Sequence, residues 1–183
     1  MGKQSKSQAI NPLTDLLIER ILDVPCDRVW RAWTEPEHIK PWFTPKPWIT
    51  SACEVDLRPG GAFNITMRTP EGEEYPNTNC YLEIQEKVKI IWTNALHAGF
   101  RPAGASLGAP LFTAIIAMEP HQKGTKYSVL VLHSNEDDAN RHKEMGFFEG
   151  WGTCIDQLTD YAKNRMVINT DKAAHGHKGA PNE

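Results

Sequence analysis

The chain has 183 residues, of which 40% are hydrophobic and 23% charged, and its formal net charge is −3. A single domain of this length buries roughly 70% of the surface of its unfolded chain, so we expect a proper hydrophobic core. The slight negative charge excludes a basic nucleic-acid footprint, and the composition is not that of an acidic disordered protein. No apolar run is long enough for a membrane span and the polar N-terminus lacks the core of a secretion signal, which predicts a cytoplasmic protein.

The first elements are predicted from periodicity and proline positions. Residues 1–13 are polar and end in Asn11-Pro12, which is typical of a loose leader. Residues 15–22 are compatible with a helix or a strand, and their β-branched side chains favour a strand. Apolar residues at helical spacing predict a short helix over residues 26–34, and a capping-box pattern at residues 34–37 predicts a second one towards Trp42.

A run of strands follows. Alternation over residues 51–58 and again from residue 63 to residue 67 predicts half-buried strands, joined by a tight reversal at Pro59-Gly60-Gly61. A second turn at residues 69–72 leads to further strands. We expect these at residues 79–85, 88–93, 111–119 and 125–133.

Two segments interrupt this regularity. Residues 94–110 form a long connection rich in small residues, of the kind that often makes a lid or a site wall. A long amphipathic helix is predicted from a cap at Asn135 or Asp137 to about Lys163. It contains three glycines, each costing about 1 kcal/mol in a helix interior, so we expect a strand or a ligand to approach the backbone closely there. They are Gly146, Gly150 and Gly152.

Polar residues 164–183 are expected to be disordered, which leaves residues 14–163 as the folded domain. His175 and His177 in this tail do not amount to a defined metal site. The cysteines are far apart and form no Cys-x-x-Cys pair, which favours buried reduced thiols over a zinc site. They are Cys26, Cys53, Cys80 and Cys154. We expect no metal and no cofactor.

The order of the elements predicts an α+β fold. A strand, two short helices, about six strands joined by hairpins and one long C-terminal helix suggest a twisted antiparallel sheet wrapped around that helix. A curved sheet that grips a helix commonly leaves a cavity between the two.

Several separated motifs resemble a known family. They are Val29-Trp-Arg-Ala32, Pro36-Glu-His-Ile-Lys-Pro-Trp42, Asp56-Leu-Arg-Pro-Gly-Gly61, Trp92-Thr-Asn-Ala95, Gly99-Phe-Arg-Pro102 and the stretch from His133 to Trp151. Over residues 13–163 the chain is similar to bacterial START-like (SRPBCC) proteins, in the branch of homologues of the heat-shock-protein-90 ATPase activator. The resemblance implies the helix-grip fold of START-like and Bet v-like proteins. It implies function less directly, because members bind varied hydrophobic molecules and some are enzymes.

Aromatic and apolar residues on the strands and the long helix are candidates for the wall of a ligand cavity. For any one of them an ordinary filled core is the favoured explanation, whereas the group together favours a cavity. The candidates are Phe63, Ile65, Met67, Tyr81, Trp92, Phe112, Tyr127, Phe147 and Trp151.

Four polar residues are further candidates. His133 and His142 can lie near each other at the cavity mouth, where a histidine could act as acid or base. We favour helix capping and surface hydrogen bonding for both. Arg58 or Arg101 could bind a ligand carboxylate, although an ion pair of Arg58 with Asp56 explains the same pattern. No motif of nucleophilic catalysis is present in the sequence.

The leading hypothesis is non-covalent binding of a small hydrophobic or aromatic molecule, without covalent chemistry. One alternative is a polyketide cyclase or dehydratase that uses the same cavity. Another is a chaperone cofactor that stimulates an ATPase, although residues 1–13 cannot supply the extra N-terminal chaperone-binding domain of the eukaryotic activator. Exposed edge strands would also permit a homodimer.

Overall fold

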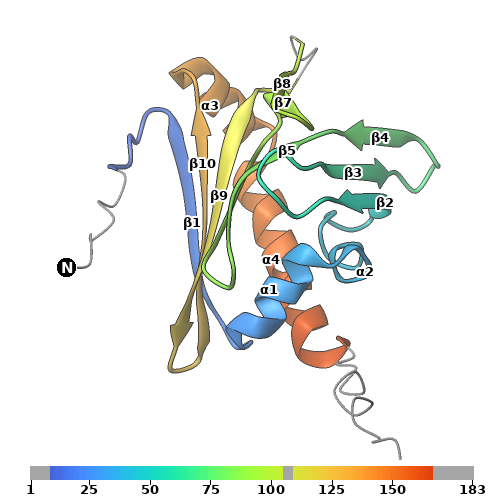
Figure 1. The fold of residues 1–183 in the computed structure, drawn as a ribbon, viewed down its shortest axis with the longest axis vertical. Coiled ribbons are helices and arrows are strands. Elements are labelled where there is room, and N and C mark those ends of the chain that lie inside the picture. The colour runs from blue at the N-terminus through green and yellow to red at the C-terminus, as the bar shows by residue number, and fades with distance from the viewer. Residues whose placement is uncertain (1–8, 105–108, 167–183) are drawn as a thin grey trace, which may run out of the picture.

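Helices pack against a curved arrangement of antiparallel strands in the computed structural model, which describes residues 9–104 and 109–166 (Figure 1). The helices are α1 (Cys26–Thr34), α2 (Pro36–Ile39), α3 (Glu136–Glu144) and α4 (Phe147–Asn164). The strands are β1 (Asp15–Leu22), β2 (Ile49–Val55), β3 (Phe63–Arg68), β4 (Glu74–Asn77), β5 (Cys80–Gln85), β6 (Lys89–Thr93), β7 (Leu96–His97), β8 (Arg101–Pro102), β9 (Phe112–His121) and β10 (Gly124–His133).

Two sheets form one curved surface. The larger has five strands in the order β1-β10-β9-β6-β5, and the smaller has three in the order β2-β3-β4. Every pairing in them is antiparallel. The sheets are joined where Ala62 bridges Cys80 and where the Tyr81 amide donates to the Gly61 carbonyl at 3.0 Å. The smaller sheet therefore turns away from the larger one without losing contact with it (Figure 1).

Helices α1 and α4 bury their apolar faces inside this curve. In α1 the buried side chains are Val29, Trp30, Ala32 and Trp33, which lie at helical spacing. Trp33 is fully buried, and its indole N–H donates to the Tyr127 hydroxyl on β10 at 3.1 Å. The ring centroid of Trp33 lies 6.4 Å from that of Trp151 on α4. One side chain thus links both helices to the sheet, as expected of a helix-grip fold.

The turn between β2 and β3 depends on two glycines. Gly60 has a φ of +78°, which L side chains rarely adopt, and a Cβ on Gly61 would lie 1.9 Å from the Asp56 carbonyl oxygen. The reversal predicted at these residues is present. Strand β2 ends earlier than the alternation predicted, because its last residue is Val55 and Leu57 is already exposed.

The long helix predicted from residue 135 is divided into α3 and α4. Asn135 caps α3 as expected, since its side-chain oxygen accepts from the Asp138 amide at 2.8 Å. Gly146 then adopts a φ of +87°, a left-handed conformation that ends one helix and begins the next. Gly146 therefore allows the chain to change direction between α3 and α4.

Gly150 and Gly152 were expected to permit close approach of a strand or of a ligand, and the strand alternative was wrong. A Cβ built on either glycine meets no heavy atom within 4 Å outside the backbone of its own helix. No strand presses against α4 at these positions. The space beside Gly150 is open.

Three local predictions also differ from the structure. No capping box forms at α2, because the Thr34 hydroxyl donates to the Trp30 carbonyl of α1 at 2.9 Å. Strand β4 was missed, since all four of its residues are exposed and give no alternation. Two short strands, β7 and β8, pair within the predicted loop.

Two predictions fall wholly or partly on residues outside the described ranges. They are the disordered tail, including His175 and His177, and most of the N-terminal leader. Within the described ranges, no helix combines the length and the apolar character that crossing a membrane requires.

The two kinds of glycine predict opposite responses to alanine. Gly146→Ala should lower the free energy of unfolding by about 1 kcal/mol or more, because alanine is strained at positive φ. Gly152→Ala, in a regular helical turn with open space around it, should raise that free energy by up to about 1 kcal/mol. Urea unfolding of both variants would check this, and equal effects would contradict the assigned role of Gly146.

Candidate functional site

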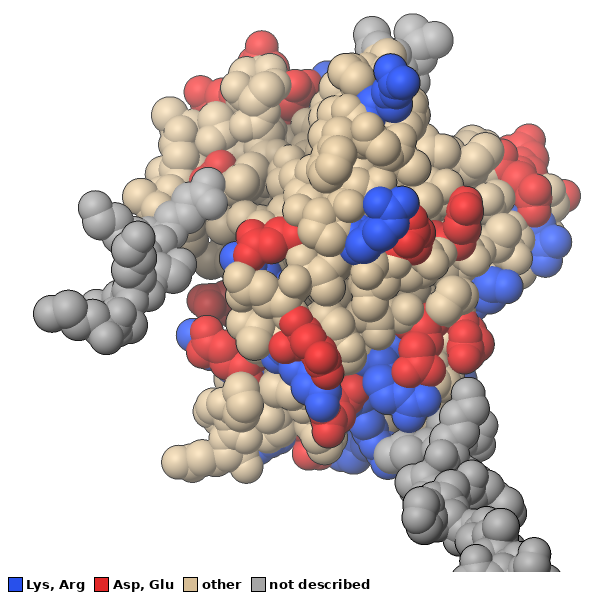
Figure 2. Space-filling model, viewed as in Figure 1, with Lys and Arg blue, Asp and Glu red and all other residues tan. Residues whose placement is uncertain are grey.

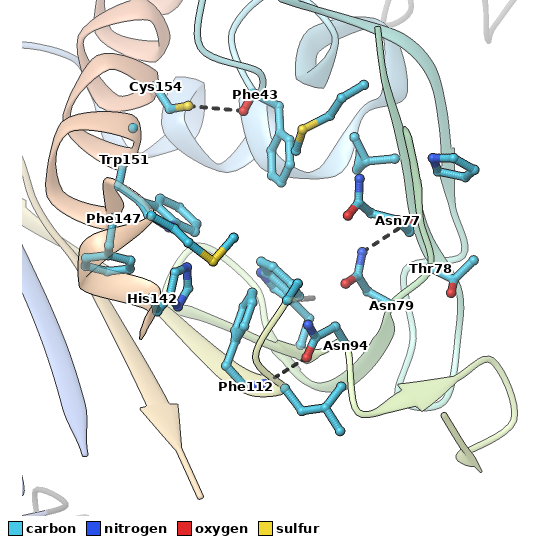
Figure 3. A pocket seen from close by; sticks show the side chains of 18 of the residues that line it. Phe43, Asn77, Thr78, Asn79, Asn94, Phe112, His142, Phe147, Trp151 and Cys154 are labelled. Carbon is cyan, nitrogen blue, oxygen red and sulfur yellow. Dashed lines mark hydrogen bonds between the residues drawn. The ribbon is translucent and has the colours of Figure 1, made fainter. Parts of the chain in front are cut away.

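A cavity of about 610 Å³ lies where α3, α4 and the two sheets meet. On the strand side its wall includes β3, the end of β4 and the residues before β5, β6, β7, the residues on both sides of positions 105–108 and the start of β9. On the helix side it includes His142, the α3–α4 junction, the first turns of α4 and the loop after α2. Figure 3 shows the side chains of α4 on one side of this space and those of the strands on the other. The cavity is of the size that small-molecule sites in proteins usually have.

Most of the wall is apolar, and it is assembled from segments far apart in the sequence. Edge-to-face contacts between neighbouring rings hold parts of it together, such as Trp92 with Phe112 at 5.4 Å and Trp42 with Phe43 at 5.5 Å between centroids. The large apolar side chains that line the cavity are Trp42, Phe43, Ile65, Met67, Trp92, Leu111, Phe112, Met145, Phe147 and Trp151.

The loop after α2 is anchored to α4. The side-chain amide of Gln157 donates to the Trp42 and Thr44 carbonyls at 2.8 and 2.9 Å, and the Cys154 thiol donates to the Phe43 carbonyl at 3.1 Å. These bonds fix Trp42 and Phe43 as one end of the cavity. Burial raises the pKa of the Cys154 thiol to about 12, so the cavity's cysteine is not a thiolate nucleophile near neutral pH.

Asparagines supply polar groups on the opposite side. Asn94 is held at both ends of its side-chain amide, because its nitrogen donates to the Pro110 carbonyl at 3.1 Å and its oxygen accepts from the Phe112 amide at 2.8 Å. Asn79 is buried and its amide nitrogen donates to the Phe63 carbonyl at 2.8 Å. No donor among the described residues reaches the side-chain oxygen of Asn79, which faces the cavity in Figure 3.

His133 and His142 form a hydrogen-bonded pair beside the cavity. His133 is only 8% exposed, and its Nδ1 lies 2.9 Å from the Thr14 carbonyl oxygen. Its Nε2 lies 2.9 Å from Nδ1 of His142. The His142 ring lines the cavity and lies between Phe112 and Phe147, with centroid distances of 5.1 and 5.0 Å (Figure 3).

The environment of His142 favours its neutral form. Burial, together with the neighbouring His133, lowers the pKa of His142 from 6.5 to about 4. The imidazole therefore carries no charge near pH 7. Helix capping, the simpler explanation considered for these histidines, does not apply, because Asn135 caps α3.

Seven of the sequence candidates lie in the cavity wall. They are Ile65, Met67, Trp92, Phe112, His142, Phe147 and Trp151. Phe63, Tyr81 and Tyr127 instead belong to the fully buried core beneath it. The same alternation that placed their neighbours in the wall could not separate these two layers, since both face inward.

The two arginine candidates lie outside the cavity wall. Arg58 is exposed and forms an ion pair with Asp56 at 2.8 Å, which is the structural explanation considered for it. Arg101 is exposed on β8. Neither guanidinium is placed to meet a molecule in the cavity.

Sequence reasoning missed other wall residues, notably Trp42, Phe43, Asn79 and Met145. Trp42 and Phe43 follow a helix in a proline-rich stretch where no periodicity applies. Met145 lies at the unpredicted helix break. Residues on both sides of positions 105–108 also line the cavity, in agreement with the predicted role of the long connection as a site wall.

Two buried donors have no hydrogen-bond partner among the described residues. They are the Tyr81 hydroxyl and the Trp92 indole N–H. An unpaired buried group of this kind costs about 1 to 3 kcal/mol. Trp92 lies in the cavity wall, so one of these two unpaired groups lies in the same region as the open space.

A group of possible metal ligands lies elsewhere, at Glu35, Glu37 and His38, with ligand atoms within 4.8 Å of one another. The Arg31 guanidinium already lies among these side chains. It donates to both Glu35 oxygens at 2.6 and 3.0 Å and lies 3.2 Å from Nε2 of His38. A fixed positive charge there opposes cation binding.

Figure 2 shows the distribution of charge on one face of the molecule. Lysine and arginine side chains lie interspersed with aspartate and glutamate there, and uncharged surface separates them. This face carries no large field of one sign.

The chain matches a family model over residues 23–163, and the model describes "Activator of Hsp90 ATPase homolog 1-like protein". The matched segment begins just after β1, and it covers the smaller sheet, the other four strands of the larger sheet and most of α4. The chain belongs to this family. The START-like resemblance seen in the sequence is thereby confirmed. None of the curated proteins was found to be similar to the chain.

Solved structures support the family assignment. A protein of Nitrosomonas europaea is 46% identical, with a TM-score of 0.78, over 82% of this chain and 95% of that one. A protein of Mycobacterium smegmatis shares 20% identity at a TM-score of 0.70, over 85% and 94% of the two chains. An AHSA1-like protein of Aeromonas hydrophila shares 17% at 0.61, over 84% and 99%. At these lower identities the likeness shows the fold alone.

The low pKa of His142 predicts a pH-dependent stability for this family member. In the unfolded chain the imidazole binds a proton near pH 6.5, whereas in the folded chain it does so only near pH 4. The stabilisation is therefore complete above pH 6.5 and is lost as the pH falls towards 4. Allowing for partial exposure, we expect a loss of about 1 to 2 kcal/mol that is absent in His142→Asn. The free energy of unfolding of parent and variant, measured between pH 7 and pH 4, checks this, and an equal loss in both proteins would contradict it.

Proposed function

We propose that the protein binds a small hydrophobic or aromatic molecule, without covalent chemistry, in the cavity between its sheets and α4. The observation that carries the proposal is a cavity of about 610 Å³ whose wall is mostly aromatic and aliphatic, with a few polar groups. Apolar surface that stays open inside a fold contributes no burial energy to folding, whereas a ligand of matching character gains that energy on binding.

The geometry of α4 supports the same proposal. Gly150 lines the cavity, and its missing side chain leaves space that a larger residue would fill. Glycine costs about 1 kcal/mol relative to alanine in a helix, and no close contact explains it here. Ligand space is the remaining explanation, of the two considered, for glycine at this position.

Filling this space should block binding without unfolding the protein. Gly150→Leu should weaken binding of the apolar fluorophore N-phenylnaphthylamine roughly tenfold or more, because leucine occupies part of the cavity. Gly152→Leu is the matched control, since Gly152 lies two residues further along the same helix and does not line the cavity. It should bind the fluorophore like the parent. Fluorescence titration measures both affinities.

Equal affinities for parent, Gly150→Leu and Gly152→Leu would show that the fluorophore binds elsewhere. Native mass spectrometry of the protein purified from cells gives an independent measurement. A bound apolar molecule in the parent that is absent from Gly150→Leu would support the proposal, and a parent that is always empty and binds no fluorophore would refute it.

Proton transfer to a bound molecule is a second candidate function, as in polyketide cyclases or dehydratases. The specific observation that favours it is the His133–His142 pair, in which the cavity-lining member is neutral near pH 7. In a dehydration, His142 would take the proton next to a ketone and return it to the departing hydroxyl, which leaves as water. Such a step needs no cofactor.

A naphthyl β-hydroxy ketone tests this second function, because loss of water gives a conjugated enone with strong ultraviolet absorbance. The parent should accelerate enone formation, and His142→Asn should abolish the acceleration while probe binding persists. Dehydration at the uncatalysed rate in the presence of the parent would reject the enzyme function for this class of substrate.

Other expectations stay predictions. A chaperone-activating role is named in the family description, and only stimulation of a chaperone's ATPase by the purified protein would establish it here. The homodimer and the cytoplasmic location rest on the sequence alone.

A further inference from the structure

The hydrogen bonds of His133 determine which of its nitrogens carries the proton. Its Nδ1 lies 2.9 Å from the Thr14 carbonyl oxygen, and a carbonyl oxygen can only accept. Nδ1 of His133 must therefore be the donor. In the tautomer that this bond selects, Nδ1 of His133 carries the proton and Nε2 is left as the acceptor.

The same reasoning extends to His142. Nε2 of His133 is an acceptor, so Nδ1 of His142, 2.9 Å away, must donate to it. The neutral His142 then has a lone pair on Nε2, which faces away from His133. Among the described residues nothing donates to this nitrogen. The Thr14 carbonyl, directly before β1, thus determines through two imidazole rings that the cavity wall accepts a hydrogen bond at Nε2 of His142.

We propose that the relay from the Thr14 carbonyl through His133 to His142 makes the cavity select molecules that carry a hydrogen-bond donor, in particular an aromatic or alicyclic hydroxyl group. This inference rests on the proposed function and specifies its ligand. The hydroxyl donates to Nε2 of His142, while the apolar body of the ligand packs against Phe112, Phe147 and Trp151.

A second polar group of the wall has the same character. The side-chain oxygen of Asn79 is fixed as an acceptor because the amide nitrogen of that residue donates to the Phe63 carbonyl. It faces the cavity from the strand side, whereas His142 faces it from the helix side (Figure 3). Two acceptors without donors on opposite walls favour a ligand with hydroxyl groups at both ends.

The relay also disfavours other ligands. A carboxylate would place negative charge against lone pairs of His142 and Asn79, and it has no guanidinium in the cavity wall to pair with. An ether or a ketone has no proton to donate and would leave both acceptors unpaired. The lowered pKa of His142 agrees with this picture, because protonation would turn the acceptor into a charged donor.

Nuclear magnetic resonance tests the relay directly. Long-range proton–nitrogen spectra of the imidazole rings in the parent should show both His133 and His142 protonated on Nδ1 and unprotonated on Nε2. A proton on Nε2 of His142 near pH 7 would overturn the inference without touching the proposed function. This measurement needs no variant.

Two probes of similar shape test the selectivity. 2-Naphthol has a donor, and 2-methoxynaphthalene keeps the oxygen but lacks the proton. The ratio of their affinities in the parent should exceed the ratio in His142→Asn by roughly three- to tenfold, the contribution of one neutral hydrogen bond. Asparagine retains a donor at the position of Nδ1 and removes the acceptor at Nε2, so the methoxy compound should bind both proteins alike.

His142→Gln is the matched control, because glutamine can place a carbonyl oxygen near the position of Nε2 and should restore the preference for naphthol. An unchanged affinity ratio in His142→Asn would overturn the inference. The proposed function would still be tested separately, by the effect of Gly150→Leu on binding. If neither probe binds the parent, both the inference and the proposed function are wrong for naphthyl compounds. Thermal unfolding confirms that each variant is folded.

Discussion

The left-handed conformation of Gly146 is the constraint on which the candidate site depends. It divides one amphipathic stretch into α3, which packs against β10, and α4, which lies across the curved sheet. Without this break a continuous helix would carry residues 136–144 away from β10. With it, His142 meets His133 at the end of β10, and Met145, Phe147 and Gly150 line the same cavity. Glycine adopts this φ at little cost, so the break is built into the sequence.

A connected set of aromatic rings forms the floor beneath that site. Trp33 contacts Trp42, Phe43, Phe63 and Trp151 at centroid distances between 4.9 and 6.4 Å. It thereby joins α1, the loop after α2, β3 and α4. Each edge-to-face pair contributes roughly 0.5 to 1.5 kcal/mol beyond burial of its area. This floor is filled, which allows the layer above it to remain open while the fold keeps a dense core.

Much of the fold could be predicted from the sequence, because its strongest signals are periodic. The bounds of β1 and α1 agree with the predicted ones, since β-branched residues favour the strand, α1 has a clear apolar face and a proline limits the connection between them. Strand β4 could not be predicted, because both of its faces are exposed and hydrogen bonding to β3 alone defines it. The helix break was also missed, because α3 is polar, with Ala139 as its one buried residue, and only the φ of Gly146 marks where α4 begins.

The candidate site was predictable only in its apolar part. Alternation placed Ile65, Met67 and Trp92 facing inward, but it could not tell the open layer from the filled one that holds Phe63 and Tyr127. The difference depends on distances between elements, which a sequence does not carry. The two histidines were recognised as neighbours because one ends a strand and the other lies on the next helix. Their tautomers, however, depend on the Thr14 carbonyl, more than a hundred residues earlier in the chain.

Polarity and shape in the cavity therefore have different origins. Shape comes from side chains that are missing, at Gly146 and Gly150, and from rings that line the remaining space. Polarity comes from backbone carbonyl groups, which can only accept hydrogen bonds. The Thr14 carbonyl orients His142 through His133, and the Phe63 carbonyl orients the side-chain amide of Asn79. Because carbonyl groups cannot donate, the two side chains arranged by them, His142 and Asn79, present acceptors to whatever enters. A ligand that supplies donors then completes hydrogen bonds that the fold itself leaves open, and selectivity follows from the backbone rather than from any charged residue.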